Sequence, residues 1–449
     1  MNDTIAAMST AFGEAAIAVL RLSGSRAVDI ADAVFRSKKR AAELPARFAQ
    51  FGSIFDGERR VDDVVLTVFR SPASYTGEDV VEISCHGGVL VSQRILDVLL
   101  RTGARNADPG EFTQRAFLNR KLDLTQAEAV MDVISAQTDL ALRAANEQLS
   151  GTLGERIRNL RTAALDILAQ VEAYIDFPDD DISPETGVAL RGRIESALAD
   201  VGALLATAGQ GKVLREGLRT VIFGAPNVGK SSLLNRLLGY ERAIVSHHPG
   251  TTRDVLEETV NIRGIPVRLM DTAGIRESSD ELEQAGMERT RQAMDRADLV
   301  LHLAEASSAP LDQFEQGMLD SVAVSPRTLL ILNKCDLGEH AGWSGMEGVR
   351  ISCANGVGMD DLTAAIRKKA LGGVAKGDLS VAINARHQAC LEKARSFLNA
   401  ALGAFEQALS PEFIAEELRA AMDAIGDIVG RADTEELLGV IFGQFCIGK

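Results

Sequence analysis

Apolar and polar residues follow two different periods along the chain, and the points where the period changes divide it into segments. Near the start, β-branched runs between Gly, Pro and Ser predict strands at Ala16–Leu22, Val64–Phe69 and Asp79–Ile83. Apolar residues repeat at helical spacing over Val89–Leu100. We therefore expect an α+β domain over residues 1–118, with one helix among its strands.

Amphipathic helices follow from residue 119. Helical spacing of the apolar residues holds from Thr125 to about Ala208, with a break near Phe177–Gly187. The break contains Asp179-Asp180-Asp181, which we interpret as a solvated loop because a calcium loop also needs a glycine and a distal glutamate. After residue 373 the helical spacing returns and predicts three more helices, at Arg386–Gln407, Pro411–Ile425 and Thr434–Phe442.

Between these helical segments, strands alternate with helices. The alternation begins at a strand predicted over Leu218–Phe223 and continues to about Leu371, which is the rhythm of a parallel sheet. The ends of an inserted domain often lie close together. We therefore predict one discontinuous helical domain, residues 119–215 and 376–449, interrupted by an α/β domain over residues 216–375.

Composition narrows the functional classes. The net charge is −15, so RNA could bind only at a local basic patch, and 4% aromatic residues are too few for a broad base-stacking platform. Five cysteines over 449 residues do not indicate a disulfide framework, and the N-terminal residues lack the pattern of a signal peptide. No uncharged apolar stretch approaches the roughly 20 residues of a membrane span. We expect a cytoplasmic protein without membrane contact.

The first chemical motif is a P-loop, Gly224-Ala-Pro-Asn-Val-Gly229-Lys230-Ser231, between a predicted strand and a predicted helix. Its glycines let the backbone wrap phosphates, and N–H groups at the helix start point at the anion. We expect Lys230 to contact the β- and γ-phosphates and Ser231 to ligate Mg²⁺.

Three further motifs follow in the order that a GTPase requires. Thr251-Thr252 can present a hydroxyl to the γ-phosphate and Mg²⁺. Asp271-Thr272-Ala273-Gly274 follows the predicted strand Val267–Met270, and Asn333-Lys334-Cys335-Asp336 follows the predicted strand Thr328–Leu332. Each motif alone is weak evidence, but their order together predicts a GTPase.

The base is indicated by Asp336. Its carboxylate can accept from N1–H and the N2 amine of guanine, whereas adenine would leave it unpaired at a cost of about 1–3 kcal/mol. Ser352, after the strand-like Gly348–Ile351, fits a loop over the base. For hydrolysis, Ile275 stands where a Ras-type enzyme has its water-orienting glutamine. Glu283 is a candidate for that task, although its surroundings also suit a surface helix glutamate.

Longer motifs accompany these, and ordinary GTPases lack two of their signals, FLNRKLDL within Pro109–Val130 and the terminal FCIGK. The longer motifs are SYTGEDVVEISCHGG (Ser74–Gly88), PGEFTQRAFLNRKLDLTQAEAV (Pro109–Val130), PGTTRD (Pro249–Asp254) and the terminal FCIGK (Phe445–Lys449). Through them the chain resembles the MnmE (TrmE) family of tRNA modification GTPases along essentially its whole length. The resemblance implies a multidomain α/β and α fold: an N-terminal α+β folate-binding domain, a discontinuous helical domain and an inserted Ras-like P-loop G domain.

The resemblance also implies a tRNA chemistry. Such a GTPase adds a carboxymethylaminomethyl or aminomethyl group to C5 of the wobble uridine of certain tRNAs, with 5-formyl- or methylene-tetrahydrofolate as the one-carbon donor. It would be a homodimer that joins an FAD-dependent MnmG (GidA) partner in a heterotetramer. By motif, Arg21, Glu82, Lys121 and Lys449 would form the folate site. Cys446 would be a catalytic thiol or else a packed, redox-silent cysteine.

Potassium-dependent dimerisation of the G domains is implied as well. Asn227, Ser246, His248 and Thr251 would hold K⁺, and Ser231 and Thr252 would hold Mg²⁺. Glu283 matches the residue that positions water in the family, and Lys230 and Asp271 complete the catalytic set. The GTP or GDP site would comprise Asn227, Val228, Gly229, Lys230, Ser231, Ser232, Ser246, His247, His248, Pro249, Gly250, Thr251, Thr252, Asp271, Thr272, Ala273, Gly274, Asn333, Lys334, Asp336, Ser352, Cys353 and Ala354.

Two stretches depart from the family pattern. Ser246-His247-His248 stands where small or apolar residues are usual, and Ser352-Cys353-Ala354 stands where Ser-Ala-Lys is usual. Backbone contacts would survive both changes. Two other functions are compatible with parts of the sequence: a regulatory GTPase of the ribosome-assembly kind, and a one-carbon transferase with a vestigial GTPase. The first predicts normal tRNA nucleosides without the gene, and the second predicts that modification survives Asp271→Ala.

Overall fold

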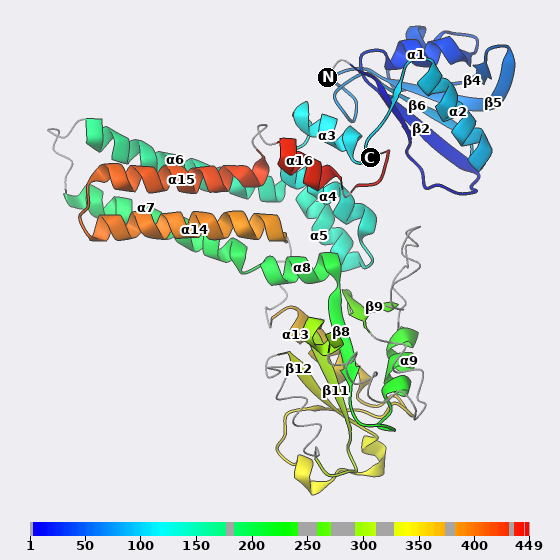
Figure 1. The fold of residues 1–449 in the computed structure, drawn as a ribbon. Helices are drawn as coiled ribbons and strands as arrows, with labels where there is room; N and C mark the ends of the chain where they lie inside the picture. The colour runs from blue at the N-terminus through cyan, green and yellow to red at the C-terminus, as the bar shows by residue number, and fades with distance from the viewer. Residues whose placement is uncertain are drawn as a thin grey trace. The chain divides into compact units, whose positions relative to one another are not determined.

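The protein is shown in Figure 1 as a computed structural model, which describes residues 3–176, 184–240, 258–270, 292–310, 327–372, 382–430, 435–443 and 445–448. The chain forms two compact units. The first combines Met1–Met131 with Val429–Lys449, and the second is Asp132–Ile428. The C-terminal segment thus lies in the same unit as the N-terminal sheet. The predicted domain boundaries at residues 118, 215 and 375 stay predictions.

A seven-stranded sheet forms the centre of the first unit, in the order β3-β4-β5-β6-β2-β1-β7. Its strands are β1 (Ile5–Met8), β2 (Ile17–Ser23), β3 (Phe35–Arg36), β4 (Phe48–Asp56), β5 (Arg59–Phe69), β6 (Val80–His86) and β7 (Arg105–Asn106). The helices are α1 (Ala27–Val34), a 3-10 turn (Ala41–Glu43), α2 (Val89–Arg101), α3 (Glu111–Leu118), α4 (Leu124–Ser135), which continues into the second unit, and α16 (Glu435–Phe442).

Alternation along the strands gives this sheet one buried and one open face. Leu20, Leu22 and Ile83 are fully buried and pack in one core with residues of α1 and α2. Ile17 and Phe51 are exposed on the other face. This period of two is the pattern expected for a sheet covered by helices on one side.

The sequence located some of these elements, but not β1, β3, β4 or β7. The strands predicted at 16–22, 64–69 and 79–83 are confirmed within β2, β5 and β6, and the predicted helix at 89–100 is α2. The expectation of a single helix before residue 118 is wrong, because α1 and α3 also lie there. Both span only eight residues, too few turns for the apolar period to stand out.

The second unit contains a group of long helices. In Figure 1, α6, α7, α14 and α15 run side by side. Its helices outside the inserted α/β part, which is described below, are the remainder of α4, α5 (Asp139–Leu149), α6 (Thr152–Asp176), α7 (Pro184–Leu205), α8 (Ala208–Glu216), α14 (Ala385–Glu406) and α15 (Pro411–Val429). The predicted helices are confirmed in place, although α15 continues beyond the predicted end at Ile425. No helix within the described ranges is long and apolar enough to cross a membrane.

The inserted α/β part has a six-stranded sheet in the order β13-β12-β11-β8-β10-β9. Its pairs are parallel except that β9 runs antiparallel to β10, so the predicted parallel sheet is confirmed with one antiparallel edge strand. Its elements are β8 (Leu218–Phe223), α9 (Lys230–Tyr240), β9 (Glu258–Ile262), β10 (Ile265–Leu269), β11 (Leu299–Glu305), β12 (Thr328–Asn333), two 3-10 turns (Cys335–Leu337 and Ala341–Trp343), β13 (Val349–Arg350) and α13 (Met359–Ala370). Strand β11 is buried at nearly every position, as expected for a central strand covered on both faces.

Candidate functional site

Three strands bring the described nucleotide motifs to one edge of this sheet. The P-loop follows β8, Asn333 ends β12, and β11 lies between these two strands. The carboxyl ends of parallel strands are where α/β sheets bind ligands, especially where the strand order reverses. The chain makes that reversal at β8, because β10 lies on one side of it and β11 on the other.

The P-loop has the backbone conformation that its sequence predicts. Gly229 has a φ of +103°, and a Cβ there would lie 2.4 Å from Nδ2 of Asn333. Asn227 is exposed with a φ of +63°, and Val228 is buried. Helix α9 begins at Lys230, whose ammonium donates to the carbonyl oxygens of Gly224 at 2.7 Å and Ala225 at 2.8 Å. Ser231 and Ser232 are exposed on its first turn.

Asn333 joins the P-loop to the loop after β13. Its Nδ2 donates to the carbonyl of Val228 at 2.8 Å, and its Oδ1 accepts from the backbone N–H of Cys353 at 3.0 Å. The side chain is buried, so losing either partner would leave a desolvated polar group. The residue therefore holds the phosphate-side and base-side loops in a fixed relation.

Lys334 and Asp336, in the same Asn333–Asp336 motif, do not join the two loops as Asn333 does. Lys334 adopts a left-handed backbone conformation, and its ammonium donates to Oε2 of Glu305 at 2.6 Å. This hydrogen bond is the main reason that the pKa of Glu305 lies below its usual value. Asp336 is exposed in the following 3-10 turn, so its carboxylate is open to a ligand.

Arg236, which the sequence did not single out, contacts the candidate base loop. From α9 its Nε donates to the carbonyl of Cys353 and its Nη2 to that of Ala354, both at 2.8 Å. Ser352 is buried in this loop, and its Oγ has no hydrogen-bond partner in the described part of the chain. Burial raises the pKa of the Cys353 thiol. No sequence signal marks Arg236, because its partners lie 117 and 118 residues away.

Many predicted site residues lie outside the described residues. They are Ser246, His247, His248, Pro249, Gly250, Thr251, Thr252, Asp271, Thr272, Ala273, Gly274, Glu283 and Lys449. Their roles, including the water-positioning role of Glu283, stay predictions.

The predicted folate residues lie in the first unit. Arg21 on β2 faces Glu82 on β6 and donates to its Oε1 through Nε at 2.9 Å and Nη2 at 2.7 Å. The same guanidinium lies 5.3 Å from the ring centroid of Tyr75 and 5.7 Å from that of Phe112. Lys121 donates to the carbonyl of Pro72, in the loop that carries Tyr75. Cation, carboxylate and aromatic rings thus meet on the face of the sheet opposite the one that α1 and α2 cover.

The C-terminal motif belongs to this unit and packs against its N-terminal part. The backbone N–H of Gly110 donates to the carbonyl of Cys446 at 3.4 Å, and the Ser9 hydroxyl donates to that of Gly448 at 3.2 Å. Gly448 has a φ of +96°, and a Cβ there would lie 2.2 Å from the carbonyl oxygen of Met8. Cys446 itself is exposed, so the structure does not pack it away as a core cysteine.

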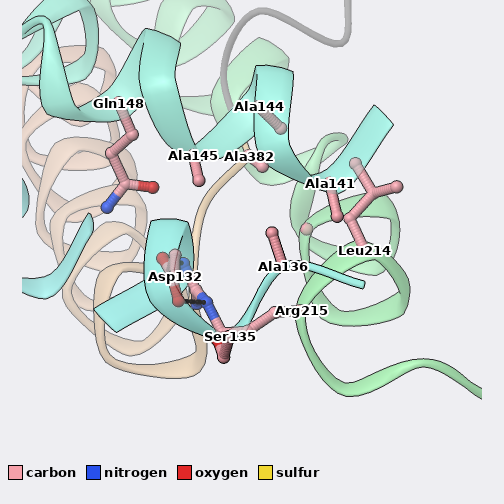
Figure 2. A pocket seen from close by; sticks show the side chains of 11 residues that line it. Asp132, Ser135, Ala136, Ala141, Ala144, Ala145, Gln148, Leu214, Arg215 and Ala382 are labelled. Carbon is pink, nitrogen blue, oxygen red and sulfur yellow. Dashed lines mark hydrogen bonds and ion pairs between the residues drawn. The ribbon is translucent and has the colours of Figure 1, made fainter. Parts of the chain in front are cut away.

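A small pocket lies where α4, α5 and α8 meet the chain leaving the G-domain region (Figure 2). Arg215 on α8 donates to both carboxylate oxygens of Asp132 at 2.7 and 2.6 Å. The other walls are mainly small side chains, including Ala141 and Ala144 of α5. These two alanines and Leu214 belong to the same hydrophobic core as β8, β9, β10 and β11.

Comparison with known proteins covers both units. Residues 4–121 match the model for the GTP-binding protein TrmE N-terminus, and residues 124–446 match the model for the MnmE helical domain. A tRNA modification GTPase MnmE from Akkermansia muciniphila is 51% identical over 99% of each chain. The chain belongs to the MnmE (TrmE) family.

A second relative also matches along the whole chain. The protein of the same name from Geobacillus kaustophilus is 46% identical over 100% of this chain and 99% of its own. Among solved structures, the G domain of the T. maritima FeoB iron transporter is 24% identical and covers 34% of this chain, with a TM-score of 0.24 that is too low to bear on the fold. The family resemblance noted from the motifs is therefore confirmed.

Proposed function

We propose that this protein is a cytoplasmic GTP-hydrolysing enzyme that modifies C5 of the wobble uridine, position 34, of certain tRNAs. One observation carries the GTPase part: Asn333 links the P-loop to the loop at residues 352–354 in a chain that matches its family over its full length. The tRNA part rests on the family, whose relatives are named tRNA modification GTPases.

The nucleotide would bind across the carboxyl ends of β8, β11 and β12. Lys230 would exchange its bonds to the carbonyls of Gly224 and Ala225 for phosphate oxygens, which are stronger, charge-assisted acceptors. Asp336 would accept from the N1–H and N2 amine of guanine. Lys334, held by Glu305, would form one wall of the base site.

Hydrolysis would also depend on bound cations and on Glu283, Asp271 and Thr252. Mg²⁺ and K⁺, when bound, would neutralise charge that develops on the phosphates. Asn227 is exposed at the mouth of the P-loop, which suits a ligand for a cation shared with a second G domain. Glu283 is proposed to orient the attacking water, and Asp271 and Thr252 to hold the metal side of the site.

The modification centre is proposed for the first unit, in a homodimer. Tetrahydrofolate, when bound, supplies the one-carbon unit. Arg21 and Lys121 offer cations for a glutamyl tail, Glu82 offers an acceptor for a pterin edge, and Tyr75 offers a ring face. Cys446 is exposed in the same unit and is proposed as a thiol that meets the tRNA. An FAD-dependent MnmG-type partner would complete a heterotetramer and the carboxymethylaminomethyl or aminomethyl product.

The first experiment measures GTP hydrolysis by the full chain in K⁺ and in Na⁺ at equal ionic strength. We expect hydrolysis to be at least about tenfold faster in K⁺, because a fixed cation can replace an arginine finger. Asn227→Ala should remove this preference while GDP still binds. Equal rates in the two salts would reject the cation assignment, and no hydrolysis in either would reject the GTPase.

A second experiment tests the tRNA role. Nucleosides of total tRNA are compared between a strain lacking the gene and strains that express the wild-type chain or Asp336→Ala. We expect the modified wobble uridine to disappear in the deletion strain and to return only with the wild type. Normal nucleosides in the deletion strain would favour a regulatory GTPase, and full rescue by Asp336→Ala would favour a transferase that does not need GTP.

A further inference from the structure

The backbone of the loop at residues 352–356 is held from outside by two side chains, those of Arg236 and Asn333. The guanidinium of Arg236 donates to the carbonyl oxygens of Cys353 and Ala354. Asn333 holds the same loop through the N–H of Cys353. Ala354 has no side chain that could fix its own position, so the loop depends on these two partners and on its internal turn, where Ser352 and Val357 are hydrogen-bonded.

These bonds set the direction of two peptide groups. In a trans peptide the C=O and N–H point in opposite directions. Because the carbonyls of Cys353 and Ala354 point to Arg236, the N–H groups of Ala354 and Asn355 point away from it. Neither N–H has a hydrogen-bond partner within the described residues. They are therefore donors on the side of the loop opposite α9.

A donor pair of this kind selects one edge of a purine. The carbonyl O6 of guanine accepts hydrogen bonds, whereas adenine carries a donating amine at the same position. Asp336, the predicted reader of N1–H and N2, lies in the motif whose Asn333 bonds this loop. A loop with fixed N–H donors would thus read O6 while Asp336 reads the other two groups.

We propose that Arg236 is a positioning residue for guanine: by holding two carbonyls it points backbone N–H groups at O6, and so sets base affinity without touching the nucleotide. This inference rests on the proposed guanine-nucleotide function. It means that α9, whose first turn follows the P-loop, also orients the loop that binds the base. Loss of Arg236 should therefore weaken binding of the base and leave the phosphate chemistry in place.

The test measures the dissociation constants of GDP and IDP for the full-length wild type, Arg236→Ala and Arg236→Lys by titration calorimetry. Hypoxanthine keeps O6 and N1–H and lacks only the N2 amine. We expect Arg236→Ala to raise the dissociation constants of GDP and IDP by about tenfold each, which is equivalent to roughly one lost hydrogen bond. The ratio of the two constants should stay unchanged. Arg236→Lys, which keeps the charge and can reach one carbonyl, should recover part of the loss. In GTP hydrolysis, KM should rise and kcat should stay the same.

Arg263→Ala is the matched control. Arg263 lies in the same domain and also bonds a backbone carbonyl, that of Asp360, but none of its hydrogen bonds within the described residues reaches the P-loop or the base loop. It should leave both dissociation constants unchanged. Wild-type affinity in Arg236→Ala, a loss for GDP that exceeds the loss for IDP, or an equal loss in the control would each overturn the inference while the GTPase stands. If Arg236→Ala does not fold, wild-type affinity in Arg236→Lys together with Arg236→Gln would overturn it. A wild-type chain that binds neither nucleotide would overturn the proposed function itself.

Discussion

His302 should make the G domain sensitive to mild acid. It lies in the middle of β11, the central strand between β8 and β12, and only 2% of its surface is exposed. Its Nε2 has no hydrogen-bond partner within the described residues, and its ring lies 5.7 Å from that of Phe223. Burial without a partner for the charged form lowers the pKa of His302 from 6.5 to about 4.

The sign and size of the effect follow from this shift. In the unfolded chain the imidazole takes up a proton near pH 6.5, but in the folded chain only near pH 4. Between these values the unfolded state binds more protons, so the free energy of unfolding falls as the pH falls. The loss is roughly 1 kcal/mol at pH 5.5 and would reach about 3 kcal/mol at pH 4, where it levels off.

The chain has one tryptophan, Trp343, which is buried in the same domain and reports its unfolding selectively. Urea unfolding followed by its fluorescence at pH 7.5 and 5.5 would compare the wild type with His302→Leu, which cannot titrate. Because every other group is shared, the difference between the two proteins isolates His302. We expect the wild type to lose roughly 1 kcal/mol more than His302→Leu over this range. Parallel losses in the two proteins would refute a neutral, buried His302.

Three further predictions concern coupling within the chain. Asn333→Ala should weaken GDP binding by about 10- to 100-fold in calorimetry, since it frees both loops that this residue joins. Gly448→Ala should abolish wobble-uridine modification in a nucleoside assay while GTP hydrolysis continues, because a side chain there collides with the N-terminal unit; intact modification would contradict this role. Asp132→Asn should break the ion pair with Arg215 and lower tRNA modification more than GTP hydrolysis. The control is Glu172→Gln, which removes the exposed ion pair with Arg419 and should change neither activity.

The sequence could predict those parts of the site whose residues are contiguous along the chain. An apolar strand, a glycine-rich turn and a helix start follow each other between Leu218 and Lys230, and each has its own local pattern. The same holds for Asn333, where a strand ends in a short polar motif. Local chemistry decides such elements, so they can be located before any tertiary contact is known.

The contacts that hold these motifs together could not be predicted in this way. Asn333 bonds a carbonyl 105 residues away, and Arg236 bonds two that are 117 and 118 residues away. In the first unit, Arg115 is buried and forms ion pairs with Glu78 and Asp3, which lie 37 and 112 residues away. Such partners are fixed by topology, and a single sequence carries no period or spacing that reveals them.

The core around the pocket of Figure 2 suggests how the nucleotide site could act on the helices. In the sequence, Asp271 comes two residues after the end of β10, and it is the residue proposed to hold the metal next to the γ-phosphate. The hairpin before it places Gly264 against Leu140 of α5, and Arg268 donates to the backbone of α8 at Glu216. Since α5, α8 and β10 share one hydrophobic core, a shift of the strand cannot be absorbed by loose packing and must move the helices with it. We therefore expect changes at the γ-phosphate to reach the helices through β10, with the Arg215 ion pair as the polar part of that connection.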